Sequence, residues 1–372
     1  MTNVGTRETT KVVDGGSPLA GKMSLLGLPR ARLQQVLAPH VERSFRVDQI
    51  YRAIYDRGIR RFDDVTTLPL ALRRHLSAHF SLELPDVVKR HRSADGTEKY
   101  LFRLADGATI EAVDIPEGDR RTLCVSSQAG CALACRFCVT GYWGAGRDLT
   151  AGEIVAQVLA IRAVERPGTH GLNVVFMGMG EPLLNTENLR LATQILLEQI
   201  SWRRVTLSTA GVVPGLRELA AWEQRPRLAI SLHAPDDERR SRLMPINKKY
   251  PLAALLGALR QIPLRSKERI TFEYILIDRW NDGPDDAELL HRLLQNLPSK
   301  VNLIPLNPDP VLDPKLRRPP DARVEAFRKR LAELGTRVTV RRQRGDDVSA
   351  ACGQLRVPGR DPRGFRRSNF SF

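Results

Sequence analysis

The apolar residues near the start of the chain recur at the spacing of a helix. Five of them lie three or four positions apart and define one apolar face: Val47, Ile50, Tyr51, Ile54 and Tyr55. Gly58 follows where a helix commonly ends, and Pro69 stands where a second helix can begin. This pattern predicts a small helical domain, which we assign to residues 23–95.

A β-hairpin is predicted next along the chain. Two β-like runs between residues 99 and 115 flank the pair Asp106-Gly107, which favours a tight turn. We assign residues 96–120 to this hairpin, as a linker that leads into a larger domain over residues 121–355.

The larger domain repeats a strand followed by a helix. Its candidate strands are rich in apolar residues and cover residues 123–126, 174–177, 205–208, 228–232, 270–276, 301–305 and 338–341. This alternation is typical of parallel strands joined by right-handed crossovers. Six or seven units are too few for a closed eight-stranded barrel. We therefore predict an α/β fold built on a partial (βα)6-type barrel, although a doubly wound sheet has the same local pattern. In either fold, ligands bind at the C-terminal ends of the strands.

The charge of the chain points to a polyanionic partner. Its 372 residues include 58 Lys and Arg against 42 Asp and Glu, a formal net charge of +16, and the basic residues occur along the whole length. Nucleic acid is the first candidate. A membrane surface is the alternative, but we find neither an apolar run of about 18 residues nor a basic amphipathic helix with an aromatic face.

The two ends of the chain differ in composition from the rest. Residues 1–22 are polar and Gly-rich and lack the apolar segment of a signal peptide, which predicts a disordered N-terminus and a cytoplasmic protein. Residues 356–372 are rich in Arg, Pro and Gly without an apolar period. They predict a basic tail that either meets phosphate groups or is simply solvated.

The five cysteines carry the clearest chemical signal. An odd number in a chain without an export signal argues against a disulfide framework. Cys131, Cys135 and Cys138 fall within eight residues, and soft thiolates at this spacing suit an iron-sulfur cluster or zinc. Three cysteines leave one iron of a four-iron cluster open, whereas Cys124 or a histidine could complete a structural zinc site.

A second motif follows an apolar strand. Residues 177–182 (MGMGEP) come directly after the apolar run 174–176. Glycines at a strand end allow a close backbone approach, and the carboxylate of Glu181 can accept hydrogen bonds from an ammonium group. Alone, such a motif is more often a tight turn. Together with the three cysteines, it indicates a binding site.

These motifs resemble those of a known family. The three-cysteine spacing is that of the radical-SAM superfamily, where SAM is S-adenosylmethionine, and residues 121–131 (RTLCVSSQAGC) resemble the RlmN/Cfr family of RNA adenine methyltransferases. Further stretches resemble blocks of that family in the same order: residues 177–185 (MGMGEPLLN), 207–211 (LSTAG), 230–235 (ISLHAP), 243–250 (LMPINKKY), 302–308 (NLIPLNP) and 344–355 (RGDDVSAACGQL). The helical segment before them resembles the N-terminal RNA-binding extension of the family.

The resemblance implies a [4Fe-4S] cluster and two SAM molecules per turnover. Cys131, Cys135 and Cys138 would ligate three irons, and SAM would chelate the fourth through its amino and carboxylate groups. Gly180 and Glu181 would meet the ammonium group of SAM. The other SAM contact positions of the family are occupied by Ser208, Ser231, Leu232, His233 and Asn307.

The resemblance also assigns roles to the two outlying cysteines and to one carboxylate. Cys352 falls on the position that becomes S-methylcysteine, Cys124 on the resolving cysteine and Glu111 on the proposed general base. In the implied route one SAM methylates Cys352, and a second yields a 5′-deoxyadenosyl radical that takes a hydrogen from that methyl group. The methylene radical adds to adenine C2, and Cys124 releases the product as a Cys124–Cys352 disulfide forms. The alternative is that both cysteines are core residues.

Two features favour methylation at C2 over C8. Cfr-type enzymes, which methylate C8, typically carry Ala where this chain has Pro182, and the acidic pair Asp346-Asp347 resembles the C2 type. The substrates implied are an adenosine in the peptidyl-transferase centre of naked or immature 23S rRNA and the adenosine 3′ of the anticodon in certain tRNAs. We also expect a monomer, no membrane partner and an electron donor such as flavodoxin.

Two other functions compete with this interpretation. A zinc-stabilised RNA-binding protein would use the same basic surface and the same three cysteines. Thiomethylation of tRNA is another radical-SAM reaction, but it usually needs a second cluster, for which this chain has too few cysteines.

Overall fold

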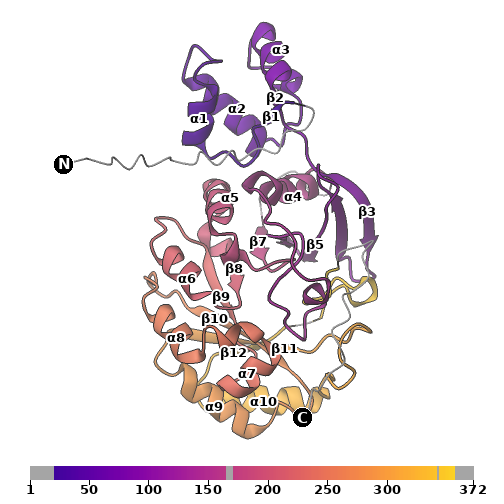
Figure 1. The fold of residues 1–372 in the computed structure, drawn as a ribbon, viewed down its shortest axis with the longest axis vertical. Coiled ribbons are helices and arrows are strands. Elements are labelled where there is room, and N and C mark those ends of the chain that lie inside the picture. Colours follow the sequence, from indigo (N-terminus) through magenta and orange to yellow (C-terminus); the bar gives the residue numbers. More distant parts are fainter. Residues whose placement is uncertain (1–20, 165–170, 342, 357–372) are drawn as a thin grey trace, which may run out of the picture.

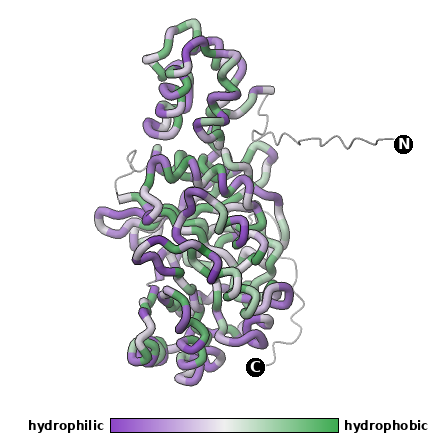
Figure 2. Tube along the Cα trace, turned by 90° about the vertical axis from the view of Figure 1, so that its left-hand side faces the viewer, coloured by the Kyte–Doolittle hydropathy of each residue, from purple (hydrophilic) through white to green (hydrophobic). Residues whose placement is uncertain are grey.

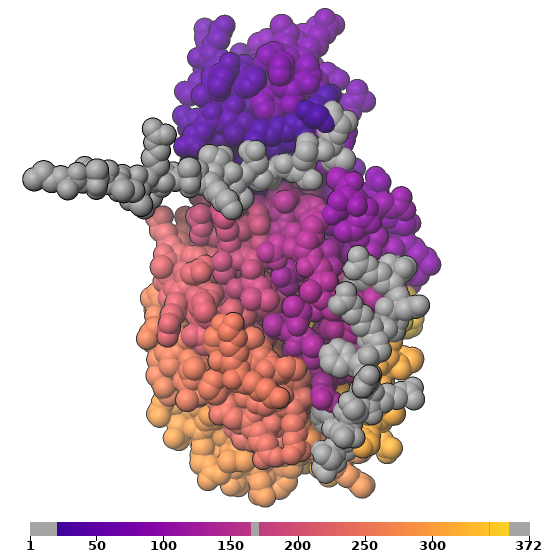
Figure 3. Space-filling view, viewed as in Figure 1, coloured from indigo at the N-terminus to yellow at the C-terminus, as the bar shows by residue number. Residues whose placement is uncertain are grey.

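The computed structural model describes residues 21–164, 171–341 and 343–356. A small N-terminal lobe stands at one end of a larger domain (Figure 3). The predicted disordered N-terminus, except for its last two residues, and the predicted basic tail, except for Arg356, lie outside the described residues.

The N-terminal lobe is largely helical, as predicted. Its described elements are β1 (Met23–Ser24), α1 (Arg30–Leu37), α2 (Phe45–Tyr55), the short 3-10 helix η1 (Phe62–Asp64), α3 (Leu70–His79) and β2 (Phe80–Ser81). The five apolar residues that define the predicted helix face are all buried in α2, and α3 begins directly behind Pro69. Burial of this face stabilises helices that are too short to be stable alone.

The hairpin predicted from Asp106-Gly107 is present and belongs to a larger sheet. Antiparallel pairing joins β3 (Asp86–Arg92), β4 (Glu98–Arg103), β5 (Thr109–Glu117) and β6 (Arg120–Cys124). The sequence analysis placed β3 at the end of the helical segment and did not predict the strand. Six of its seven residues are exposed, so it lacks the alternation of apolar and polar residues that marks a half-buried strand.

The strands after the hairpin are parallel and follow one another in sequence order. They are β7 (Leu172–Phe176), β8 (Val205–Thr209), β9 (Arg227–Ser231), β10 (Ile270–Leu276), β11 (Ser299–Pro305) and β12 (Val338–Val340). Each pairs in parallel with the preceding strand, so the described sheet runs from β3 to β12 without a change of order. A doubly wound sheet reverses its strand order at a switch point, so this topology confirms the partial barrel.

Helices cover the outer side of the sheet, as Figure 1 shows. They are α4 (Ala151–Val164), α5 (Thr186–Gln199), α6 (Val213–Ala220), α7 (Asp237–Leu243), α8 (Leu252–Arg260), α9 (Pro284–Leu294) and α10 (Asp321–Glu333). Short 3-10 helices lie at η2 (Val139–Trp143), η3 (Pro182–Leu184), η4 (Trp202–Arg204), η5 (Pro245–Lys248) and η6 (Asp346–Val348). Figure 2 shows hydrophobic residues concentrated along the inner segments of this domain. In the part of the chain that the structure describes, no helix has the length and apolar character needed to cross a bilayer.

Candidate functional site

The predicted site residues gather where the parallel strands end. Cys124 is the last residue of β6, and the Gly180-Glu181 pair follows β7. Ser208 lies at the end of β8, and Ser231 is the last residue of β9. The C-terminal ends of parallel strands meet at one edge of the sheet, so these residues share one mouth of the barrel.

Two neighbouring cavities open at this mouth. The first is lined by most of the predicted cluster and SAM residues: Cys131, Cys135, Cys138, Gly180, Glu181, Ser208, Ser231 and His233. The second has a volume of about 520 Å³ and is lined by Cys124 and Asn307 among others. Cys352 lines both cavities and therefore lies where they meet. Leu232 is fully buried and lines neither.

The three-cysteine loop is held in place by backbone hydrogen bonds. The amide of Cys131 donates to the Gly144 carbonyl at 2.9 Å, and the amide of Arg136 donates to the Leu243 carbonyl at 2.9 Å. Ala134, between the first two cysteines, has a left-handed backbone with φ of 52°. A non-glycine residue rarely adopts this conformation, and such residues cluster at functional sites.

The three thiols suit a bound metal centre. Burial raises the pKa of Cys131 to about 12 and raises the pKa of Cys135 and Cys138, and neighbouring cysteines add to each shift. Such thiols do not ionise at neutral pH unless a cation stabilises the thiolates, which is what iron does. Cys124 is the cysteine that could have completed a zinc site, but it lines the other cavity.

Glycines shape the part of the first cavity that follows β7. Gly180 has φ of 100°, and a Cβ atom there would lie 2.6 Å from the Cβ of Gln128. A Cβ on Gly178 would lie 2.6 Å from the carbonyl carbon of Val125. Only glycine fits at either position, so the backbone after β7 packs directly against the segment that leads to the three-cysteine loop.

Glu181 is buried with its carboxylate already hydrogen-bonded. Its Oε1 accepts from the Thr209 hydroxyl at 2.5 Å and from the Leu183 amide at 3.0 Å, and its Oε2 accepts from the Ala210 amide at 2.8 Å. Burial raises the pKa of this carboxyl group. A carboxylate has about four acceptor positions, so Oε2 keeps the capacity to accept from an ammonium group.

His233 is fixed as a neutral ring of one tautomer. The backbone amide of Ile275 donates to its Nδ1 at 3.1 Å, so Nε2 carries the proton. The residue has φ of 62°, a strained conformation outside glycine, and its ring stands edge-on to Phe137 of the three-cysteine loop at 4.4 Å between centroids. Burial, followed by the charge of Arg240, lowers the pKa of His233 to about 3.

This shift predicts an acid-sensitive fold. The unfolded chain takes up a proton at His233 near pH 6.5, whereas the folded chain does so only near pH 3. Stability is therefore fully present above pH 6.5 and falls below it, by up to about 1.4 kcal/mol per pH unit from this residue. Denaturant unfolding should be measured for the cluster-free wild type and the cluster-free His233→Gln variant. The free energy of unfolding should fall less steeply between pH 6.5 and 4 in the variant than in the wild type. An unchanged slope in His233→Gln would contradict the assignment.

The segment that carries Cys352 packs on the three-cysteine loop. The Val139 amide donates to the Gly353 carbonyl at 2.6 Å, and the Thr140 hydroxyl donates to the Leu355 carbonyl at 2.7 Å. Asn307 donates from Nδ2 to the Cys352 carbonyl at 3.1 Å. These contacts hold the Cys352 backbone beside the three-cysteine loop. The five cysteines all lie in the described residues, and all are free.

Arg341 lies close to both outlying cysteines, although the sequence analysis did not select it. It follows β12 and lines both cavities. The pKa of its guanidinium is raised first by Cys352 and also by Glu273 and Cys124. Arg341 is therefore a partly buried cation where the two cavities meet, close to both sulfur atoms.

Glu111 lies on β5 and lines neither of the two cavities. The next strand position on the same face, Val113, pairs with Cys124. The carboxylate of Glu111 lies 3.2 Å from Lys99 Nζ and accepts from the Arg356 amide at 2.8 Å. Burial raises the pKa of Glu111, and Lys99 opposes the shift. Lys99 also donates to the Ser349 carbonyl at 3.3 Å, which links this carboxylate to the segment before Cys352.

Arg240 is a second residue that the sequence analysis did not select. Its side chain is 1% exposed and donates to the carbonyls of Leu232 at 3.1 Å, Ala210 at 2.7 Å and Ser231 at 3.1 Å. Burial lowers its pKa to about 10. Arg240 therefore satisfies carbonyl groups at and just beyond the ends of β8 and β9 and supports the wall of the first cavity.

Two family models match the chain. The one described as the Radical SAM superfamily matches residues 125–294 and includes the three-cysteine loop. The one described as the Ribosomal RNA large subunit methyltransferase N-terminal domain matches residues 23–82, the N-terminal lobe.

Curated relatives match nearly the whole chain. The "Dual-specificity RNA methyltransferase RlmN" of Anaeromyxobacter dehalogenans is 45% identical over 351 residues, 91% of this chain and 94% of the relative. The protein of the same name from Syntrophobacter fumaroxidans is 47% identical over 318 residues, 84% of this chain and 92% of the relative. The chain belongs to the RlmN family.

A solved structure of similar sequence supports the radical-SAM methyltransferase fold. The crystal structure of a radical SAM methyltransferase from Sphaerobacter thermophilus is 43% identical, has a TM-score of 0.83 and covers 90% of this chain and 99% of its own. The resemblance to RlmN and the radical-SAM fold predicted from sequence are thus confirmed. Membership of a radical-SAM family implies a [4Fe-4S] cluster and SAM as cofactors.

Proposed function

We propose that this chain methylates C2 of an adenosine in 23S rRNA and of the adenosine 3′ of the anticodon in certain tRNAs, through a methyl group carried on Cys352. One observation carries the proposal: Cys352 lines both the cavity of the three-cysteine motif and the cavity of Cys124. A sulfur in that position can receive a methyl group on one side and present it on the other. The relatives named as dual-specificity RNA methyltransferases support RNA as the substrate.

The residues of the first cavity fit the two cofactors. Three irons of the cluster would be held by Cys131, Cys135 and Cys138. SAM would bind the fourth iron. Glu181 and the backbone at Gly180 would receive the ammonium group of SAM. When bound, the cluster would supply the electron for the reductive cleavage of SAM. We propose two SAM molecules per turnover.

The remaining SAM residues contribute differently. Ser208, Ser231 and His233 line the first cavity, and the Nε2–H group of His233 would donate to SAM. Leu232 would contribute only through its backbone, since its side chain is fully buried. Asn307 would act on the Cys352 backbone, to which it donates.

Adenine C2 lies between two ring nitrogens and is electron-poor, so it cannot displace a methyl group from SAM as a nucleophile does. Cys352 solves this problem because its thiolate accepts a methyl group, from which a hydrogen can then be removed. Arg341 would stabilise the thiolate of Cys352 before methylation and that of Cys124 during release. Glu111 would remove the C2 proton, and Lys99 and the Arg356 amide would orient its carboxylate.

The second cavity fits an adenine base with a polyanionic backbone at its rim. Its volume of about 520 Å³ lies within the range of ligand pockets. Besides the two cysteines, it is lined by basic and polar side chains that include Arg318, Arg344, Asn302 and Gln343. An RNA target would therefore enter with its base turned out of the stack. We propose naked or immature rRNA as one substrate, a monomeric cytoplasmic enzyme and a flavodoxin-type electron donor.

Nucleoside analysis of treated RNA tests this function. Protein with a reconstituted cluster, SAM and a reductant should convert one adenosine of a 23S rRNA fragment, and one of a suitable tRNA, to 2-methyladenosine, because Pro182 favours the C2 type. Mass spectrometry of digested RNA measures the product. A transcript with guanosine at the target position is the control and should remain unmethylated. 8-Methyladenosine would transfer the chain to the Cfr type, and a lack of methylated adenosine would refute the proposal.

A further inference from the structure

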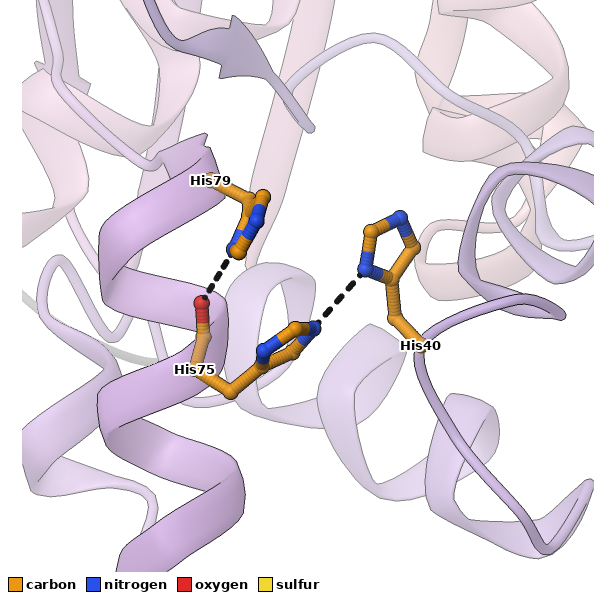
Figure 4. A group of neighbouring side chains, drawn as sticks. All are labelled: His40, His75 and His79. Carbon is orange, nitrogen blue, oxygen red and sulfur yellow. Dashed lines mark hydrogen bonds between the residues drawn. The ribbon is translucent and has the colours of Figure 1, made fainter.

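Three histidines of the N-terminal lobe face one another far from the three-cysteine loop in sequence. His75 and His79 are one helical turn apart on α3, and His40 lies in the connection between α1 and α2 (Figure 4). The potential ligand nitrogens of the three rings all lie within 4.8 Å of one another. Among the His, Cys, Asp and Glu side chains of the described residues, these three have ligand atoms close enough together to hold one metal ion.

The ring of His79 is oriented as a metal ligand usually is. His79 directs Nδ1 at the His75 carbonyl at 2.9 Å. A carbonyl can only accept, so Nδ1 carries the proton and Nε2 of the neutral ring has a free electron pair. Histidine ligands of metals almost always donate their second ring nitrogen to a carbonyl or carboxylate in this manner. Phe80 packs edge-on against His40 at 4.9 Å between centroids and fixes that ring from its other side.

The spacing of the nitrogens fits an ion after a small adjustment. His40 Nδ1 and His75 Nε2 lie 2.9 Å apart and share one hydrogen bond. Two nitrogens of a tetrahedral zinc site lie about 3.3 Å apart, given zinc-nitrogen distances near 2.0 to 2.1 Å. An ion bound by these two nitrogens would replace the shared proton, and the His79 ring, whose ligand nitrogen lies within 4.8 Å of both, would turn toward it. His75 and His79 are exposed, so their rings can rotate and water can reach a fourth position.

We propose that His40, His75 and His79 form a binding site for a divalent transition metal of the zinc class, completed by water. The bound ion ties the connection between α1 and α2, residues 38–44, to α3. In the free lobe, a single hydrogen bond and ring contacts among these histidines, together with Phe80, join these two parts at this point. Imidazole ligands suit zinc, copper and nickel. The site is independent of the cluster and of the proposed methyl transfer.

Calorimetric titration of zinc into cluster-loaded protein under anaerobic conditions tests the site. The cluster occupies the three cysteines, so their thiols do not compete for zinc. The wild type should bind about one zinc ion per chain at this site. The variants His40→Gln, His75→Gln and His79→Gln should each lack this binding. The matched control is His91→Gln, which lies on β3 outside the group and should bind zinc as the wild type does. Because His75 and His79 are exposed and His40 is only partly buried, these variants should fold.

Hydrogen exchange tests the role of the ion. Zinc should slow amide exchange in residues 38–44 and in α3 of the wild type and leave exchange in the three variants unchanged. Equal zinc binding by the wild type and the three variants would overturn the site, as would a wild type that binds none. Zinc binding that leaves exchange in residues 38–44 unchanged would overturn its role in joining the two segments.

Discussion

Replacement of Cys131, Cys135 or Cys138 by alanine is expected to abolish both iron binding and RNA methylation. In the proposed function each thiolate would hold one iron, and the two remaining thiolates would be too few protein ligands for a four-iron cluster. Iron and sulfide analysis of anaerobically purified protein measures the first loss, and nucleoside mass spectrometry measures the second.

The control for these variants is Cys124→Ala. Cys124 lines the second cavity and not the first, so this variant should keep its iron and sulfide. Full iron content and activity in any one of the variants at Cys131, Cys135 or Cys138 would contradict the assignment. Zinc without iron in the wild type would favour the zinc-stabilised RNA-binding protein instead.

Cys124→Ala is expected to trap the protein covalently on its RNA, whereas Cys352→Ala should not react. In the proposed route Cys352 carries the methyl group, so its loss would prevent formation of a radical on a protein sulfur. In the same route Cys124 acts only after the carbon-carbon bond exists, so its loss should leave adenine C2 joined through a methylene group to the Cys352 sulfur. Denaturing gels before and after nuclease digestion reveal the RNA-linked protein.

A purely structural role of the two cysteines predicts a different outcome. Each alanine substitution would then lower the stability of the fold modestly, as small core truncations do, and the two variants would behave alike. Cys124 is 6% exposed, so the measurement must include the stability of each variant. RNA linked to neither variant, with similar losses of stability, would return both cysteines to the core.

Much of the fold follows from local sequence. The apolar strands β7 to β11 are short runs between helical segments, and all were predicted within a few residues of their observed bounds. The choice between a partial barrel and a doubly wound sheet was not predictable locally, because strand order depends on pairing between distant segments. Strand β3 was missed because its polar, exposed residues carry no periodic signal.

The predicted site residues lie in contiguous motifs, whereas the missed ones come together only in the fold. Arg341 reaches Cys124 and Cys352 from β12, and Arg240 reaches the ends of β8 and β9 from α7. Neither arginine differs locally from the many other basic residues of the chain. Glu273, which lines the first cavity, did carry a signal, because an acidic residue inside the fully buried strand β10 is costly unless it has a partner.

The most direct test of the central claim is the isotopic composition of the methyl group that reaches the RNA. The enzyme should be turned over with SAM whose methyl group carries three deuterium atoms, and the methylated adenosine should be analysed by mass spectrometry. Removal of a hydrogen from methylated Cys352 leaves a methylene group, so the product should contain two deuterium atoms and one hydrogen from another source. A product with all three deuterium atoms at C2 would show direct transfer of an intact methyl group and would contradict the account.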